Sequence, residues 1–201
     1  MRSTKIGTII LAAGGSTRLG SPKQLLKFEG ITLIRRAASS AIDAGCHPAI
    51  VVTGAASEDV RGELDGLDVH EIFNSEWQTG MASSIKAGLD SVLILEPQID
   101  AVVVMLSDQP HVTAEVIKRL IEAYVTTSKP IAASSYGEDF GVPALFDKKH
   151  FDELYELEGD HGAKPIIMKH KSEVEFVDFP DGAIDIDTPD DLRRLTSRNP
   201  A

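Results

Sequence analysis

The chain has 201 residues, which suits one domain with a sizeable core and leaves little room for two. Hydrophobic residues make up 42% and charged residues 25%, so the composition is that of an ordinary globular protein. A net charge of −11 disfavours binding to nucleic acid or anionic membranes, and no stretch is apolar enough to span a bilayer. The single cysteine, Cys46, excludes an internal disulfide, so we expect one cytoplasmic domain over residues 1–201.

Short apolar runs alternate with amphipathic segments along the chain. In chain order they predict a strand at 6–11, a helix at 31–44, a strand at 49–53, a helix at 57–64, a strand at 69–73, a helix at 81–95, a strand at 101–106, a helix from Thr113 to about 125, weaker strands at 129–134 and 174–177, and a short helix opening at Thr188-Pro189. Continuously apolar strands that alternate with helices are typical of parallel sheets covered on both faces. The pattern therefore predicts a mostly parallel α/β fold.

The loop after the first strand carries the densest motif, at the edge of the sheet where such folds bind ligands. Gly14 and Gly15 let backbone amides approach a ligand, and Arg18 and Lys23 supply cations that suit phosphates. An ordinary Gly-rich turn would explain the glycines, but it does not explain both cations on so acidic a protein. The loop lacks the three spaced glycines of the dinucleotide fingerprint and the Gly-Lys-Ser/Thr of the P-loop.

The run from Leu11 to Lys23, continuing to Gly30, resembles the signature of the MobA-like nucleotidyltransferases that build dinucleotide forms of the molybdenum cofactor. It is closer to the molybdopterin cytidylyltransferases, whose loop reads Leu-Ala-Ala-Gly, than to the guanylyltransferases, which have Leu-Ala-Gly-Gly. Further matching motifs cover nearly the whole chain, at 79–85, 107–110, 141–146, 159–164 and 185–189. Val142 departs from the pattern, because cytidylyltransferases often carry His there; this difference concerns the acceptor more than the chemistry.

This resemblance implies a single-domain, Rossmann-like, three-layer α/β/α sandwich of the nucleotide-diphospho-sugar (GT-A-like) transferase type. It also implies that a nucleoside triphosphate, with CTP favoured, contacts Leu11, Ala12, Ala13, Gly14, Gly15, Ser16, Arg18, Lys23, Gly80 and Ser84. Arg18, Lys23 and Asp108 are the implied catalytic residues. Ser83 and Ser84 open a predicted helix, where plain capping is an equally good interpretation.

Two acidic sites are candidates for Mg²⁺. Asp108 follows the strongest predicted strand, although a lone Asp there is often only the cap of the next helix. The resemblance implies that Asp108 and Asp185 hold Mg²⁺. Asp187 would orient its loop or hydrogen-bond to the groups that bind the metal. The purely structural alternative is that Asp187 or Thr188 caps the last helix.

The acceptor side is less defined. His161, Lys164 and Asp187 are candidate contacts to a small phosphorylated acceptor, although Lys164 could equally be a solvated surface residue. The six histidines show no metal-ligand spacing in the sequence. Trp77, the only tryptophan, is interpreted as a packing residue.

In the expected reaction, an acceptor phosphate attacks the α-phosphorus of the triphosphate and pyrophosphate leaves, so no strong general base is needed. Ala13 would narrow the base pocket against a purine. Alternatives are transfer from GTP or to another small phosphate such as a sugar phosphate, and a non-catalytic module that delivers molybdenum cofactor. Transient contact with a molybdoenzyme or its chaperone is a further expectation. An NAD-dependent oxidoreductase is disfavoured by the missing fingerprint.

Overall fold

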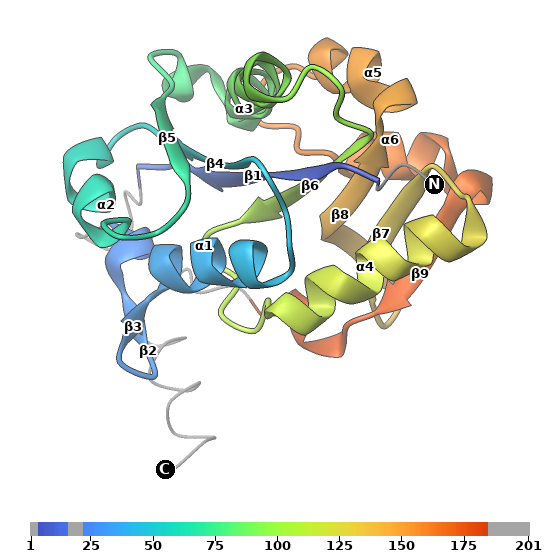
Figure 1. The fold of residues 1–201 in the computed structure, drawn as a ribbon, viewed down its shortest axis with the longest axis horizontal. Helices are drawn as coiled ribbons and strands as arrows, with labels where there is room; N and C mark the ends of the chain where they lie inside the picture. Colours follow the sequence, from blue (N-terminus) through green and yellow to red (C-terminus); the bar gives the residue numbers. More distant parts are fainter. Residues whose placement is uncertain (1–3, 16–21, 185–201) are drawn as a thin grey trace.

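The computed structural model describes residues 4–15 and 22–184. Its centre is a seven-stranded sheet (Figure 1), with β1 (Ile6–Ala12), β4 (Ala49–Thr53), β5 (His70–Phe73), β6 (Ala101–Leu106), β7 (Ile131–Tyr136), β8 (Asp139–Asp147) and β9 (Val174–Asp178) in the order β5-β4-β1-β6-β8-β7-β9. Strands β5, β4, β1 and β6 are parallel, whereas β8 runs antiparallel to both β6 and β7. The predicted mostly parallel α/β fold is confirmed.

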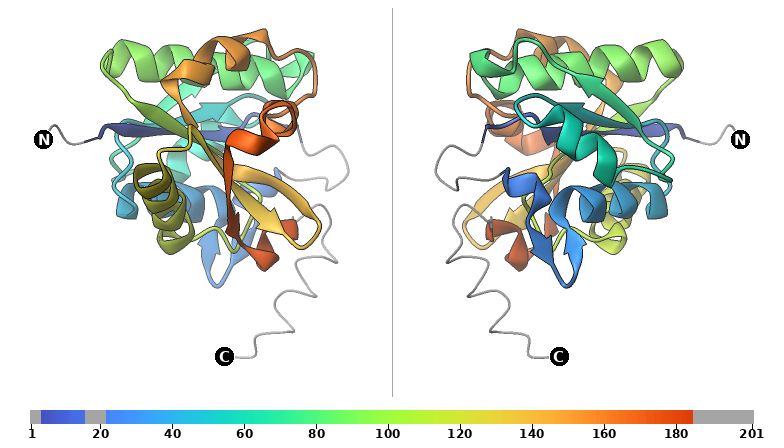
Figure 2. Two further views of the ribbon diagram at one scale, coloured as in Figure 1. Left: turned by 90° about the vertical axis from the view of Figure 1, so that its right-hand side faces the viewer. Right: turned by 90° about the vertical axis from the view of Figure 1, so that its left-hand side faces the viewer.

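Helices cover both faces of the sheet (Figures 1 and 2). On one face, α1 (Leu33–Asp43), α2 (Ser57–Glu63) and α4 (Ala114–Thr127) bury apolar side chains such as Ile34, Val60 and Ile117. On the other face, α3 (Met81–Leu95), α5 (Phe151–Glu156) and α6 (Lys164–Lys169) do the same with Ile85, Leu154 and Ile167. The three-layer sandwich is therefore also confirmed. Among the described residues, no helix combines the length and apolarity needed to cross a membrane.

Most predicted elements are present, with shifted ends. The helix expected at 31–44 begins at Leu33, because β3 (Ile31–Thr32) pairs with β2 (Lys27–Phe28) in a hairpin that comes before it. Gly45, with a φ of +85°, follows the last turn of this helix. Strand β8 and helices α5 and α6 were not predicted, and the helix expected at Thr188-Pro189 lies outside the described residues.

The two central strands place the site. In the register of β1 with β6, Leu11 lies opposite Leu106, and the Ser107 amide donates to the Leu11 carbonyl at 3.2 Å. Because both strands end at this level, the Gly-rich loop and the Ser107-Asp108 segment leave the sheet side by side.

Candidate active site

A cavity of about 540 Å³ opens at the edge of the sheet where β1 and β6 end. Its lining includes many of the predicted binding and catalytic residues: Leu11, Ala13, Gly14, Gly15, Lys23, Gly80, Ser84 and Asp108. Ala12 is different, because its side chain is 2% exposed and packs into the core beside α1. Ser16 and Arg18 lie outside the described residues.

Lys23 and Asp108 pair directly across the cavity. The ammonium group of Lys23, at the start of the 3-10 turn Lys23–Leu25, donates to Oδ2 of Asp108. The Asp108 side chain is 8% exposed, and its Oδ1 is buried with no hydrogen-bond partner among the described residues. A buried acceptor without a donor costs about 1–3 kcal/mol, and a divalent cation would remove this cost. The geometry at Asp108 therefore fits a metal ligand, while Asp185 lies outside the described residues.

Gln24 fixes the start of the Gly-rich loop. Its side chain is 1% exposed, and Nε2 donates to the carbonyls of Ala12 and Gly14, both at 2.9 Å. These bonds hold the loop backbone where β1 ends. This role was not predicted; the available signal was an amide side chain directly after Lys23, within the motif at 11–30.

Asn74 joins the end of β5 to the first turn of α3. Its Nδ2 donates to the hydroxyls of Ser83 and Ser84, at 2.8 and 3.0 Å, and its Oδ1 accepts from the Glu76 amide. Ser83 donates onward to the Gly80 carbonyl at 2.8 Å. The described residues offer the Ser84 hydroxyl no acceptor, and Ser84 lines the cavity, so its proton is available to a ligand. Asn74 was also missed.

Gly80 is required by the packing of two backbone segments. Its φ is +120°, and a Cβ placed there would lie 2.2 Å from the carbonyl carbon of Gly159. The Gly159 carbonyl accepts from the Ala82 amide at 3.0 Å, so the 157–163 loop rests on the start of α3. Gly80 therefore permits the close approach of another backbone segment of the same chain.

A second cavity of about 350 Å³ adjoins the first, since Leu11, Met81 and Leu106 line both. Lys164 also lines it, with Nζ 2.5 Å from Asp139 Oδ1 and 5.5 Å from the Phe140 ring centroid. This hydrogen bond is the main reason that the pKa of Asp139 is lowered.

Of the other acceptor candidates, His161 is exposed and lines neither cavity, and Asp187 lies outside the described residues. Gln109, which the sequence analysis did not single out, lines the second cavity. Its Nε2 donates to the carbonyls of Val142 at 3.2 Å and Gly182 at 3.0 Å. This side chain therefore ties the end of β6 to β8 and to the last described segment.

Trp77 both packs and lines the first cavity. Its ring lies 3.3 Å from the place where a Cβ on Gly15 would be, and 2.7 Å from the corresponding point on Gly54. The two glycines thus leave room for the indole beside the Gly-rich loop, and the expected packing role extends to the cavity wall.

Two histidines and a glutamate form a cluster that the sequence did not predict. His150, Glu153 and His170 come together with ligand-type atoms within 4.8 Å of one another, although the sequence shows no familiar metal-ligand spacing. His170 lies 17 positions from Glu153 and reaches it only through the fold of α5 and α6.

The family model of the MobA-like NTP transferase domain matches residues 8–174. The chain belongs to this family. The MobA-like family predicted from the motifs is confirmed, and with it the nucleotidyltransferase class.

Known relatives of this MobA-like transferase carry different names. Nicotine blue oxidoreductase of Paenarthrobacter nicotinovorans is 30% identical over 93% of this chain and 94% of the relative. A molybdenum cofactor guanylyltransferase of Rhodobacter capsulatus is 27% identical over 96% of each chain.

The fold matches a solved structure, Rv0371c of Mycobacterium tuberculosis H37Rv, with a TM-score of 0.81, 34% identity, and coverage of 98% of this chain and 100% of that one. A structure of the same protein in complex with manganese matches with a TM-score of 0.77 and 31% identity, at 98% and 100% coverage.

Proposed function

We propose that this MobA-like transferase transfers CMP from CTP to the phosphate of a small acceptor, molybdopterin in the first place, with release of pyrophosphate. The observation that carries the proposal is the meeting of the Gly-rich loop, Lys23 and Asp108 around one cavity. A second cavity opens directly beside it, as transfer between two substrates requires.

The triphosphate occupies the larger cavity. Backbone amides at Gly14 and Gly15 donate to phosphate oxygens, and Lys23 exchanges part of its contact with Asp108 for a phosphate. Ser84 donates its free hydroxyl proton to the nucleotide. Ser16 and Arg18 complete the phosphate contacts from their place in the signature.

Asp108, together with Asp185, would hold Mg²⁺. The buried, unpaired Oδ1 of Asp108 supports this assignment, and so does the manganese complex of the Rv0371c protein. When bound, the cation neutralises phosphate charge and favours in-line displacement. Lys23, which contacts the other carboxylate oxygen of Asp108, would add its positive charge to the neutralisation of the phosphates.

The acceptor occupies the second cavity, whose walls include Tyr136 and Phe140. Aromatic and aliphatic walls suit a flat, partly apolar ring system, and Lys164 at the same cavity would meet its phosphate. His161 and Asp187 are proposed as further acceptor contacts only from their places in the family motifs. The phosphate of the acceptor is already anionic at neutral pH, which removes the need for a strong base. Delivery of the product to a molybdoenzyme or its chaperone in the cytoplasm belongs to the same proposal.

Cytosine selectivity would come from Ala13, whose methyl group stands in the lining where the guanylyltransferases have glycine. Replacing Ala13 with Gly would widen the base pocket and shift the ratio of CTP to GTP affinity toward GTP. An unchanged ratio would remove this part of the proposal while leaving the reaction class intact.

The experiment is calorimetric titration with CTP, GTP, ATP and UTP, with and without Mg²⁺, on the wild type, Asp108→Asn and the control Asp59→Asn. Asp59 is exposed on α2, so the control makes the same charge change away from the cavity. Mg²⁺-dependent binding of CTP that is lost only in Asp108→Asn would support the proposal. Preference for GTP would show that the transferred group is guanylyl and not cytidylyl, and no binding of any triphosphate would reject the catalytic assignment.

One relative bears an oxidoreductase name, so the same preparations are titrated with reduced nicotinamide cofactors. Binding of these in place of triphosphates would favour a redox function.

A further inference from the structure

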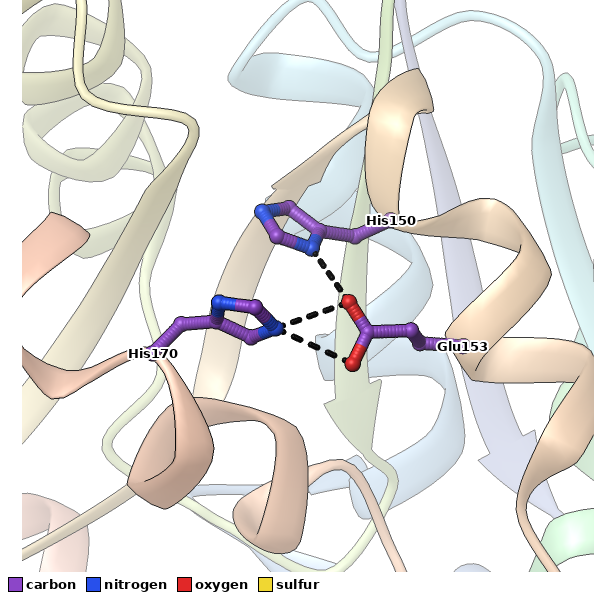
Figure 3. Close-up of side chains that lie close together, drawn as sticks. All are labelled: His150, Glu153 and His170. Atoms are coloured by element: carbon purple, nitrogen blue, oxygen red, sulfur yellow. Dashed lines mark hydrogen bonds and ion pairs between the residues drawn. The ribbon is translucent and has the colours of Figure 1, made fainter.

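Three side chains of α5, α6 and the turn before them converge on one point (Figure 3). His150 ends a 3-10 turn, Glu153 lies in the first turn of α5, and His170 follows the last residue of α6. His150 Nδ1 is 3.0 Å from Glu153 Oε1, and His170 Nε2 is 2.8 Å from Oε1 and 3.0 Å from Oε2. Two imidazole nitrogens therefore face one carboxylate.

This donor set has a definite metal preference. Neutral imidazoles and a carboxylate suit zinc and similar cations, whereas Mg²⁺ prefers a shell of oxygens. Zinc bonds of roughly 2.0–2.2 Å at tetrahedral angles separate two ligand atoms by about 3.3 Å. The N–O separations of 2.8 and 3.0 Å are a few tenths shorter, so a small outward movement would admit the ion.

We propose that His150, Glu153 and His170 form a binding site for a divalent cation of the zinc class. The site is separate from the nucleotide cavity, since none of the three residues lines it. A cation here joins the start of α5 to the end of α6. The 157–163 loop, which rests on Gly80 and borders both cavities, lies between these two helices.

The surroundings support the assignment. His150 is 3% exposed, and the side chains of Glu153 and His170 are each 20% exposed, which leaves one side open for water as a further ligand. Behind His170, Oε1 of Glu173 lies 3.6 Å from Nδ1, on the ring nitrogen that would not bind the metal. That distance is longer than a hydrogen bond, and a small rotation of either side chain would let the carboxylate accept from Nδ1 and orient the metal-binding imidazole.

Glu153 supplies the carboxylate of the site, and in the structure this carboxylate already contacts one cation. The competing cation is Lys169, whose Nζ is 2.7 Å from Oε2. Because that side chain is 65% exposed, Lys169 can turn into solvent when an ion arrives.

One feature lowers the expected affinity. With metal on Nδ1 of His150, the ring proton sits on Nε2, which is buried without a partner among the described residues. We therefore expect tighter binding than at an isolated surface histidine and weaker binding than at a structural zinc site.

The test uses the untagged full-length chain, stripped with a chelator and free of nucleotide. Zn²⁺ binding is measured by calorimetry, and Co²⁺ is added separately as a probe, because its visible absorption reports imidazole coordination. The variants are Glu153→Gln, His170→Asn and the control His47→Asn, whose imidazole is 70% exposed and lies outside the cluster. Matching circular dichroism spectra show that each variant folds, and Asp108→Asn separates this site from any cation bound in the nucleotide cavity.

We expect one equivalent of Zn²⁺ to bind to the wild type, to His47→Asn and to Asp108→Asn, in the presence of excess Mg²⁺. Binding to His170→Asn and Glu153→Gln falls by at least about tenfold. Equal Zn²⁺ affinity in wild type and His170→Asn overturns the proposal. Absence of Zn²⁺ binding to the wild type also overturns it, and Glu153 then only accepts hydrogen bonds. Loss of Zn²⁺ binding in Asp108→Asn alone would assign the ion to the nucleotide cavity and overturn the proposal.

Discussion

The ammonium group of Lys23 donates a hydrogen bond to the carboxylate of Asp108, although the two residues are 85 positions apart in the sequence. The pair joins the segment after the Gly-rich loop to the end of β6 at the cavity wall. The second carboxylate oxygen of Asp108 has no hydrogen-bond partner among the described residues. A cation could bind this oxygen, and a phosphate could bind Lys23.

Replacing Lys23 with Met is therefore expected to reduce nucleotidyl transfer by about 10²–10³, the usual loss when one stabilising charge is removed from a transition state. The control is Lys27→Met, because Lys27 is exposed on β2 and outside the cavity. Turnover is followed by pyrophosphate release with the triphosphate that binds best. Equal turnover in the two variants would show that Lys23 has no part in transfer.

Gly80→Ala is expected to lower the free energy of unfolding and to displace the 157–163 loop. Its φ of +120° is strained for alanine, at about 1–3 kcal/mol, and the new Cβ would meet the Gly159 backbone. Gly137→Ala is the matched control, since Gly137 also has a positive φ, +72°, but nothing lies near its Cβ position. Urea unfolding of both variants isolates the cost of the contact; a loss no larger than that of Gly137→Ala would show that the loop moves aside freely.

The central strands could be predicted because their residues are mostly apolar and buried on both faces, as in β1, β4 and β6. β8 was missed, because its nine residues mix Asp139, Gly141 and Pro143 with apolar positions. Its place between β6 and β7 comes from long-range pairing that no local pattern encodes. The short helices α5 and α6 give too few turns for a clear helical period.

The placement of Gly14 and Asp108 at one cavity could be predicted, because each follows the end of a central strand. Gln24 and Asn74 were not predicted, because each hydrogen-bonds to backbone or hydroxyl groups of another segment. Such contacts depend on how the segments pack. The His150–Glu153–His170 cluster escaped for the same reason, since His170 is brought in by the turn between α5 and α6. Residue spacing in the sequence predicts contacts within one helix or strand, but not contacts between different elements.

Cys46 is expected to be inert in the folded protein. Burial raises the pKa of its thiol to about 12, and the side chain is 4% exposed, so almost no thiolate forms near neutral pH. A thiol reagent should label the protein slowly in buffer and rapidly in urea. Fast labelling in buffer at the rate of the unfolded chain would contradict the burial of this thiol.

The same thiol is expected to make stability depend on pH. Because its folded pKa is raised, the stabilisation is complete below the pKa of the unfolded chain and is lost as pH rises from about 9 toward 12. In that range the free energy of unfolding should fall by about 1 kcal/mol per pH unit from this group. Cys46→Ala cannot ionise and serves as the control, so the two proteins should differ in slope; parallel curves would refute the assignment.

Trp77 is expected to report triphosphate binding through its fluorescence. It is the only tryptophan in the chain, its ring packs beside Gly15, and it lines the larger cavity. A nucleotide on the Gly-rich loop would change the polarity around the indole, so selective excitation of tryptophan should show a saturable change on titration with the triphosphate that binds in calorimetry. Asp108→Asn should shift the curve to higher concentration, whereas Asp59→Asn should reproduce the wild type. If calorimetry detects binding and the emission stays constant, the triphosphate lies elsewhere than beside Gly15, and the assignment of this cavity fails even though the protein binds nucleotide.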